Sequence, residues 1–441
     1  YKEFMKKITL EPSMMFYLDM NNSFVYNWYS IYAKLPLSPT KPNENYAREL
    51  QELYTVGKGR NNNEQLFTEE DVKAAANVLS GWCVCNNNDP SYKKFLCKDT
   101  LSYQVAYNDT LHSSKDKVFS SFYNNIVISA KKGPNGGIEE INTLIDMLFD
   151  RKESSENLVR KLYRFFVYSY ISDDAENTVI QPLAKMCSEG GNGYQPYDLK
   201  PILKALLTSA HFYDKEQIGC MIKNPYDFVV GMSRMLDVKT YNLNEIRLYP
   251  DSVFNNLTAN QIGNYIAVLA HRQSQYIRGL CFGSGMVVSS VPDVAGYPAY
   301  YQSPDFHHLW INADYLRRRK EAIHYDFQPP NGWFVGILTM SDSLFEINSN
   351  TQPLICSFAS RLNNQENIDD FIQQNIDYFL VKDLPNADKE KLKFILNETN
   401  SISWLNAWNS YKSNKNNFVN VYHKLRLFYE SLFSYAEFQL M

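Results

Sequence analysis

The 441-residue sequence lacks the short motifs on which familiar enzymes depend. It has no Gly-x-Ser-x-Gly elbow, no phosphate-binding P-loop, no dinucleotide-binding glycine pattern and no His-Glu-x-x-His pair. Histidine is also scarce, with seven residues in the whole chain. These absences exclude the common serine hydrolases, nucleotide enzymes and zinc proteases, and we expect neither a cofactor nor a metal.

Charge and hydropathy give no sign of nucleic acid or of a membrane. The formal net charge is -4, so no overall field attracts a polyanion. The longest basic run, Arg317 to Lys320, is predicted to be a solvated helix face rather than a phosphate site. No apolar run approaches the roughly 18 to 20 residues that cross a bilayer. We therefore expect a soluble chain without a transmembrane segment that binds no nucleic acid.

Cysteine is present in an odd and scattered set of seven, which does not define a disulfide framework. Cys83, Cys85 and Cys97 could supply three thiolates to a metal, but no fourth ligand follows at zinc-site spacing. A local disulfide to Cys97 is a second alternative. The favoured interpretation is a set of ordinary buried thiols.

The main pattern in the sequence is the recurrence of apolar residues at helical spacing. Thr68 to Asp71 forms a capping box, and Gly81 is placed to end the helix that follows. Other helices are predicted at 138–149, 155–167, 202–207, 258–276 and 418–438. Strands are plausible only near 81–85 and 332–338, with irregular connections near 285–305 and 325–333. The predicted class is mainly α, a multi-helix globular core with long irregular loops and few short strands.

A charged ladder lies between residues 43 and 57 and stops at a glycine. Asn43 is a good N-cap, and Glu44, Arg48 and Glu52 follow at intervals of four, so they share one helix face and can pair. Glu49 lies beside them. An exposed salt-bridged helix is one interpretation. The other is a buried arginine that holds carboxylates, with Glu49 and Glu52 able to act as acid and base or to bind a cation.

Aromatic residues make up 15% of the chain, including 32 Tyr, and they crowd one loop near residue 300. Aromatic side chains are enriched in recognition surfaces, so this loop is the candidate binding surface. Its adjacent histidines would point about 100° apart on a helix, so we favour a helix start capped by Ser303 or Asp305 over a metal site in which Asp305 adds an oxygen. The candidate residues are Tyr297, Tyr300, Tyr301, His307, His308 and Trp310.

Four stretches together resemble one bacterial family, domain-of-unknown-function family 1800. They are residues 43–57, residues 66–82, residues 160–167 with 206–212, and residues 292–312. The ending from Glu437 to Met441 is also similar to the family, whereas Tyr297 replaces the tryptophan that the fourth block usually carries. This resemblance implies a largely helical, exported protein of Bacteroidetes type, in the periplasm or at the cell surface, and it implies no catalytic residues.

The resemblance also sets expectations for the organisation of the chain. Residues 1–330 would form the helical family core, and residues 331–441 a C-terminal helical region packed on it. The chain opens inside an amphipathic segment, so we expect a truncated start that lacks the N-terminal part of the family core. Structural roles within the patterned blocks are expected for Asn43, Asp293, Gly296 and Asn312.

Four short segments share the order aspartate, hydroxyl residue, aliphatic residue, which is similar to the O-glycosylation signal of exported Bacteroidetes proteins. Their hydroxyl residues are Thr100, Thr110, Ser252 and Ser343. Roughly one or two such segments would occur by chance at ordinary composition, so the excess is modest and agrees with export.

Two classes of function remain. We favour a non-enzymatic binding protein whose partner is a glycan or another envelope protein. The resemblance points to the product of a commonly neighbouring gene of uncharacterised family 1501. The alternative is a hydrolase or metal-dependent enzyme centred on Glu44, Arg48, Glu49 and Glu52.

A substitution of Arg48 tests the ladder. If Arg48 is buried between Glu44, Glu52 and a distant carboxylate, for which Asp293 is the candidate, Arg48→Met leaves those acids unpaired and costs roughly 3 to 5 kcal/mol of unfolding free energy. Chemical denaturation measures this loss. A loss below about 1 kcal/mol would place the ladder in solvent.

Overall fold

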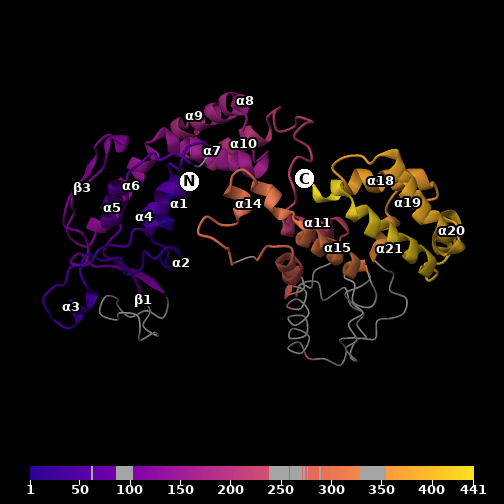
Figure 1. Cartoon of the computed structure of the whole chain (residues 1–441), viewed down its shortest axis with the longest axis horizontal. Helices are drawn as coiled ribbons and strands as arrows, with labels where there is room; N and C mark the ends of the chain where they lie inside the picture. Colours follow the sequence, from indigo (N-terminus) through magenta and orange to yellow (C-terminus); the bar gives the residue numbers. More distant parts are fainter. Residues whose placement is uncertain are drawn as a thin grey trace. The chain divides into compact units, whose positions relative to one another are not determined.

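Helices make up most of the described chain, and strands are few and short (Figure 1). The computed structural model describes residues 1–60, 63–85, 103–237, 277–287, 290–327 and 354–441, with 258, 271, 274 and 275 as single positions. The chain divides into two units, Tyr1–Tyr213 and Asp214–Met441. The predicted mainly α class is confirmed.

Unit 1 begins with short helices and ends with longer ones. Its helices are α1 (Lys2–Ile8), α2 (Pro12–Tyr17), α3 (Trp28–Tyr32), α4 (Asn45–Glu49), the π-helix η1 (Leu50–Tyr54), α5 (Glu69–Val78), the 3-10 helix η2 (Ser121–Tyr123), α6 (Gly136–Phe149), α7 (Lys152–Phe166), α8 (Asp173–Ala175), the π-helix η3 (Glu176–Ile180), α9 (Gln181–Glu189) and α10 (Leu199–Leu207).

The core of unit 1 forms where these helices meet. α6 packs against α1, α5 and α7, and α7 packs against α9 and α10. The contacts come from one apolar face of each helix, with Ile141, Leu144 and Leu148 of α6 fully buried beside Val159 of α7. The helical spacing read from the sequence therefore marks the core-facing side of each helix.

Two small antiparallel sheets complete unit 1. β1 (Trp82–Cys85) pairs with β2 (Gln104–Tyr107), with Trp82 opposite Tyr107, and β3 (Lys117–Val118) pairs with β4 (Val127–Ile128). The strand predicted at 81–85 is thus confirmed as β1, and the one predicted at 332–338 lies outside the described residues. β3 contacts α5, and β4 contacts α6, so this second sheet is held against the helical core.

Unit 2 is built around its last long helix. The described elements are α11 (Pro225–Met235), α14 (Pro298–Tyr301), the 3-10 helix η5 (Phe306–Trp310), α15 (Ala313–Phe327), α17 (Leu354–Ala359), α18 (Ile368–Phe379), α19 (Asn386–Glu398), the 3-10 helix η7 (Thr399–Ser401), α20 (Trp404–Ser413), α21 (Val419–Ser434) and the 3-10 helix η8 (Ala436–Gln439).

α21 contacts α15, α17, α19 and α20, so residues on both sides of position 330 share one core. Its buried residues include Leu425, Phe428 and Tyr429, which continue the spacing predicted for 418–438. The boundary predicted near residue 330 lies outside the described residues and stays a prediction, and the division into two units falls between Tyr213 and Asp214.

The helix start and stop predicted around α5 are confirmed. Thr68 caps α5, its side chain accepting from Asp71 N–H while the Asp71 carboxylate accepts from Thr68 N–H. Gly81 follows with a φ of +88°, in the left-handed region that glycine favours. The helix predicted at 258–276 falls largely outside the described residues. Within the described part of the chain, no helix combines the length and apolar character needed to cross a membrane.

The cysteines separate into two kinds. Among the described cysteines, Cys83 and four others are thiols that form no disulfide, and most of these are buried, as the favoured interpretation expected. Cys85 is instead disulfide-bonded. A purely thiol set was therefore the wrong interpretation for this one position.

Candidate functional site

The ladder stretch forms a helix that changes type halfway along. Asn43 begins it, since its side-chain oxygen accepts from Asn45 N–H at 2.8 Å, although the N-cap position itself belongs to Glu44. α4 then passes directly into η1, a π-helix of the kind often found at functional sites. Gly57 ends the stretch with a φ of +76°, and a Cβ on it would meet the Asn157 side chain at 2.7 Å.

Arg48 pairs with acids from two blocks of the sequence. Its guanidinium donates two hydrogen bonds to Glu69 of α5, at 2.8 and 2.6 Å. Glu44 and Glu52 lie 3.6 and 3.9 Å away, as the spacing of four predicted. We expected Asp293 as the distant carboxylate, but the structure places Glu69 in that role.

The Arg48 side chain is 32% exposed, so the ladder lies at the surface and is not the buried clamp. Glu52 also binds Lys58, at 2.6 Å. Removing Arg48 therefore leaves Glu52 with a partner, and we lower the loss expected for Arg48→Met to the range of surface ion pairs.

Side chains from later parts of unit 1 hold η1 and the residues just after it. Asn157 of α7 donates to Thr55 O at 2.7 Å, and Lys161 of the same helix, which lies in the third patterned block, donates to Leu53 O. On the other side Tyr123 donates to the Gln51 side chain at 2.8 Å. The bonds to Leu53 O and Thr55 O satisfy carbonyls at the C-terminal end of the helix, and the bond from Lys161 links the first and third blocks.

The carboxylates of the ladder are already paired with cations or have other contacts. Glu44 and Glu52 are neutralised by cations that they already bind, and Glu49 has contacts of its own. Across the described ranges no group of three His, Cys, Asp or Glu side chains is arranged to hold a metal ion.

The loop near residue 300 hides most of its aromatic rings. Tyr297 and Trp310 pack together with ring centroids 5.6 Å apart, both buried, and His307 is buried as well. Tyr300 and Tyr301 are half-buried, and His308 is exposed. Since the two central rings form a small core of their own, they are not available as a contact surface, and a binding role of this loop stays a prediction.

Other residues of that loop hold its shape. Asp293 accepts from Tyr301 O–H at 2.7 Å and from Val294 N–H at 2.6 Å, and Gly296 closes the turn with a φ of +100°. Asn312 accepts from Tyr315 N–H at the start of α15. These contacts shape the loop locally, and the structural roles expected for Asp293, Gly296 and Asn312 stay predictions.

The paired histidines begin a 3-10 helix. Asp305 stands at its N-cap, as the favoured interpretation predicted, but its side chain makes no capping bond. Burial lowers the pKa of His307 to about 4, helped by the neighbouring His308. His307 is therefore neutral at physiological pH.

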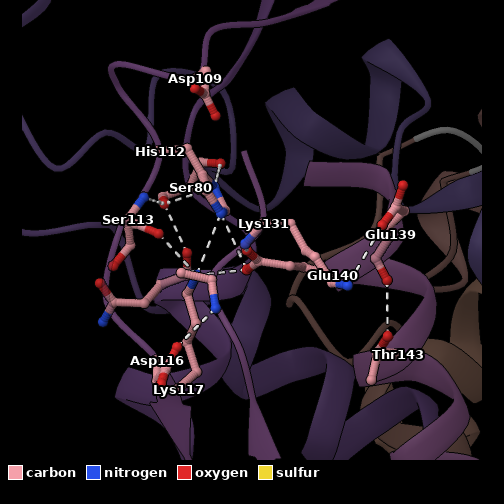
Figure 2. Close-up of polar contacts among 12 residues, drawn as sticks. Ser80, Asp109, His112, Ser113, Asp116, Lys117, Lys131, Glu139, Glu140 and Thr143 are labelled. Carbon is pink, nitrogen blue, oxygen red and sulfur yellow. Dashed lines mark hydrogen bonds and ion pairs between the residues drawn. The ribbon is translucent and has the colours of Figure 1, made fainter. Parts of the chain in front are cut away.

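The most deeply buried charged group of unit 1 was not among the predicted site residues. Glu140 of α6 is fully buried and accepts from Lys117 Nζ at 2.6 Å and from Lys131 N–H at 2.7 Å (Figure 2). His112 Nε2 lies 3.1 Å from the same carboxylate. Lys117 also donates to Ser113 O at 2.8 Å, so its ammonium is well satisfied. We call Glu140, Lys117 and His112 the Glu140 cluster.

Ser80, His112 and Glu140 lie in the order of a nucleophile, a base and an acid, but the Ser80 hydroxyl and His112 Nδ1 each donate to a backbone carbonyl. Ser80 Oγ donates to Asn77 O at 2.7 Å, and His112 Nδ1 lies 2.8 Å from Ser80 O, which can only accept. Nδ1 therefore carries a proton and cannot take one from the hydroxyl. Ser80 is also fully buried, so the Glu140 cluster is an anchor for the fold rather than a catalytic triad.

One signal in the sequence pointed to Glu140. It lies directly beside Ile141 and one turn before Leu144, on the apolar face that the helical spacing marked for the core. A carboxylate on such a face needs a partner. Its partners could not be read from spacing, because His112, Lys117 and Lys131 lie on separate loops and strand ends.

A second buried network lies in the third patterned block. Arg160 of α7 donates to both oxygens of Glu176, at 3.1 and 2.6 Å, and to Glu156 at 3.1 Å. Burial by itself would raise the pKa of Glu176, but hydrogen bonds from Arg160 and Gln181 outweigh it and the pKa is lowered. This pairing ties α7 to η3.

The glycosylation candidates are represented by one described residue. Thr110 is exposed in a turn, and the following Leu111 is fully buried. Thr100, Ser252 and Ser343 lie outside the described residues.

Comparison with known proteins identifies one family. The sequence model described as "Protein of unknown function (DUF1800)" matches residues 1–440, which confirms the resemblance carried by the four blocks. No curated protein and no solved structure matches the chain.

Substitution of Lys117 tests the Glu140 cluster. Lys117→Met leaves a buried carboxylate without its main partner, and we expect a loss of roughly 3 to 5 kcal/mol in unfolding free energy. The double variant Lys117→Met/Glu140→Met removes both charges and should recover much of that loss. Urea titration measures the unfolding free energy of both variants. The exposed pair Lys73 and Glu70, 2.7 Å apart, supplies the matched control, because Lys73→Met should lose far less unfolding free energy than Lys117→Met. Equal losses at the two sites would contradict the buried role.

Acid titration tests the same cluster in the unaltered chain. Burial would raise the pKa of Glu140, but bonds from His112, Lys117 and Lys131 N–H outweigh it and the pKa is lowered. The unfolded chain then binds the proton first, so this stabilisation is present above about pH 4.3 and is lost as the pH falls through the folded pKa. We expect unfolding free energy to fall with pH below that value, less steeply for Glu140→Gln. Identical slopes would rule the cluster out as the source.

Proposed function

The chain belongs to the family described as protein of unknown function DUF1800, and we propose that this member is an exported protein that binds another protein and catalyses no reaction. The observation that carries the proposal is an exposed aromatic surface on α3 in unit 1. Family membership supplies no activity. The proposal therefore depends on that surface and on the cations that the ladder carboxylates Glu44 and Glu52 already bind.

The α3 surface consists of three aromatic side chains and two leucines. Tyr29 and Tyr32 are 53% and 62% exposed, and both rings lie about 6 Å from that of Trp28, at 6.0 and 6.2 Å. Leu35 and Leu37 are exposed on the segment that follows. Clustered exposed apolar side chains mark interaction sites, and Tyr and Trp dominate the binding energy of such sites.

The segment that carries this surface is rigidly closed at its base. Asn27 N–H donates to Ser38 O and Thr40 N–H donates to Val25 O, each at 2.8 Å. The Asn27 side chain also caps α3 by accepting from Tyr29 N–H at 2.9 Å. A surface held in place before binding loses little conformational entropy in the complex, which favours affinity.

Beneath the surface, a small core fixes α3 to the rest of unit 1. Phe24, Cys83 and Leu111 are buried there, and Trp28 and Ile31 pack against them. α3 lies at the margin of its unit, away from α6 and α7 (Figure 1). The exposed leucines favour the apolar patch of a protein over the polar hydroxyls of a glycan, so we prefer a protein partner.

The alternative function, a hydrolase or metal-dependent enzyme at Glu44, Arg48, Glu49 and Glu52, has less support. Its carboxylates are neutralised by bound cations at the surface. A general acid or base needs a carboxylate with a perturbed environment and a free lone pair directed at substrate. We therefore keep the enzyme as the second hypothesis.

Export is part of the proposal and has independent support. Disulfides form and persist in oxidising compartments such as the periplasm and the cell surface, and Cys85 is disulfide-bonded. The exposed position of Thr110 would allow a glycan to be attached to its hydroxyl. The disulfide is in keeping with the export that the family resemblance implies, and the exposed Thr110 with the glycosylation that the aspartate–hydroxyl–aliphatic segments suggest.

Binding of the purified product of the neighbouring family 1501 gene tests the proposal. We expect the full chain to bind it and Tyr29→Ser/Tyr32→Ser to bind roughly 30-fold more weakly, the loss of a pair of hot-spot side chains. Isothermal titration calorimetry measures both affinities.

The control is Tyr170→Ser/Tyr213→Ser, which removes two rings that are each 68% exposed elsewhere in unit 1. It should bind like the unaltered chain, and circular dichroism should show the same helix content in all variants. Unchanged affinity in the α3 variant, or no binding by the unaltered chain, would refute this function for the surface.

A further inference from the structure

Two cations are buried in unit 2, and no carboxylate of its described residues lies within ion-pair distance of either. Arg319 of α15 is 1% exposed and Lys223, just before α11, is 8% exposed. The sequence predicted Arg317 to Lys320 to be a solvated helix face. That holds for Arg317, which pairs with Asp314 and Glu321, but it is wrong for Arg319. Figure 1 shows α15 and α11 in the same unit.

The partners of Arg319 are all neutral. Its Nη2 donates to Lys223 O at 2.7 Å and its Nη1 to the Gln439 side-chain oxygen at 3.0 Å, and its guanidinium lies over the Phe228 ring. Its Nε is buried and has no hydrogen-bond partner. Burial lowers the pKa of Arg319 to about 10, with no opposing charge to restore it.

Lys223 is placed in the same way. Its Nζ donates to Phe438 O at 2.7 Å and lies 4.2 Å from the centre of the Phe438 ring. Burial, with a smaller repulsion from Arg319, lowers its pKa to about 8 despite the attraction of Asp227. In the described part of unit 2 no carboxylate lies within ion-pair distance of either cation.

Burying two cations without a paired acid lowers the stability of the folded chain. A buried charge is normally paired with an opposite charge, and a buried N–H with an acceptor, because each loses its hydration. Arg160 of unit 1 shows the usual solution, with Glu176 bound to it at 2.6 Å. Arg319 and Lys223 instead have carbonyl and amide dipoles and the faces of two aromatic rings.

The Gln439 side chain marks where an anion would lie. Its amide oxygen accepts from Arg319, and an amide has the same shape as a carboxylate but carries no charge. The backbone around it is fixed, because Lys223 N–H donates to Gln439 O at 2.8 Å and residues 222 and 440 form a β-bridge. To admit another group, the Gln439 side chain must turn aside and give up its bonds with Arg319 and with Phe433 O.

We propose that Arg319 and Lys223 form a binding site for a carboxylate group, and that the Gln439 amide is its neutral occupant in the unliganded chain. A carboxylate in the place of the Gln439 amide would accept a charge-assisted hydrogen bond from Nη1, which is stronger than the bond to the neutral amide. Because the guanidinium is 1% exposed, the site takes a small carboxylate ligand, and it belongs to unit 2, whereas the α3 surface belongs to unit 1.

Sodium acetate serves as the probe, with the thermal unfolding midpoint of the full chain as the readout. Binding to the folded state raises the midpoint, so acetate should stabilise the chain more than sodium chloride at equal ionic strength. Gln439→Glu places a carboxylate on Arg319 permanently. It should raise the midpoint by roughly 3 °C at neutral pH and abolish the extra effect of acetate.

Gln195→Glu is the matched control, since it adds the same charge at an exposed position of unit 1. It should neither raise the unfolding midpoint nor abolish the extra effect of acetate. The proposal fails if Gln439→Glu does not raise the midpoint, if acetate acts no better than chloride on the unaltered chain, or if its effect survives in Gln439→Glu. An equal effect of sodium phosphate that is likewise lost in Gln439→Glu would overturn the assignment to carboxylates, since phosphate also stabilises folded chains without binding a site.

Discussion

A single buried carboxylate, that of Glu140, connects α6 to the start of β3 and to the loops that carry His112 and Lys131. It lies on the core-facing side of α6, where ionisation is tolerated only because Lys117 and Lys131 N–H direct hydrogen bonds at both of its oxygens. Through Lys117 it holds the start of β3, and through His112 the end of α5, whose Ser80 carbonyl accepts from that imidazole. Segments that have little apolar surface are thereby fixed to the helical core.

A buried charge needs partners that replace its hydration, and this requirement distinguishes the charged groups that hold the fold from those at the candidate sites. Buried charges with full partners, at Glu140 and at Arg160, lie between helices and loops and serve the fold. The charges around Arg48 are paired at the surface, where they contribute less. Arg319 and Lys223 are buried with no described carboxylate of unit 2 within ion-pair distance, and this departure from the requirement is what points to a ligand rather than to stability.

Much of the helical architecture could be predicted from the sequence, because amphipathic spacing and caps are local. α5, α6, α7 and α21 lie where apolar spacing placed them, and Thr68 caps α5 as predicted. The ladder pairs followed from a spacing of four. The predictions that failed concerned long-range contacts. The partner of Arg48 is Glu69, and the tyrosine-rich loop buries the rings of Tyr297 and Trp310, because an aromatic ring with a polar tip can pack in a core as well as on a surface.

Amide hydrogen exchange tests most directly whether the Glu140 cluster holds this part of the fold. The reporter is Phe119 N–H, which donates to Ile126 O at 3.0 Å beside β3 and does not touch Glu140 itself. In Glu140→Gln the Phe119 amide should exchange at least roughly tenfold faster than in the unaltered chain, because the β3–β4 hairpin opens more often, while amides of α10 keep their protection. Equal exchange at Phe119 in both proteins would contradict the claim that this carboxylate anchors the hairpin to the core.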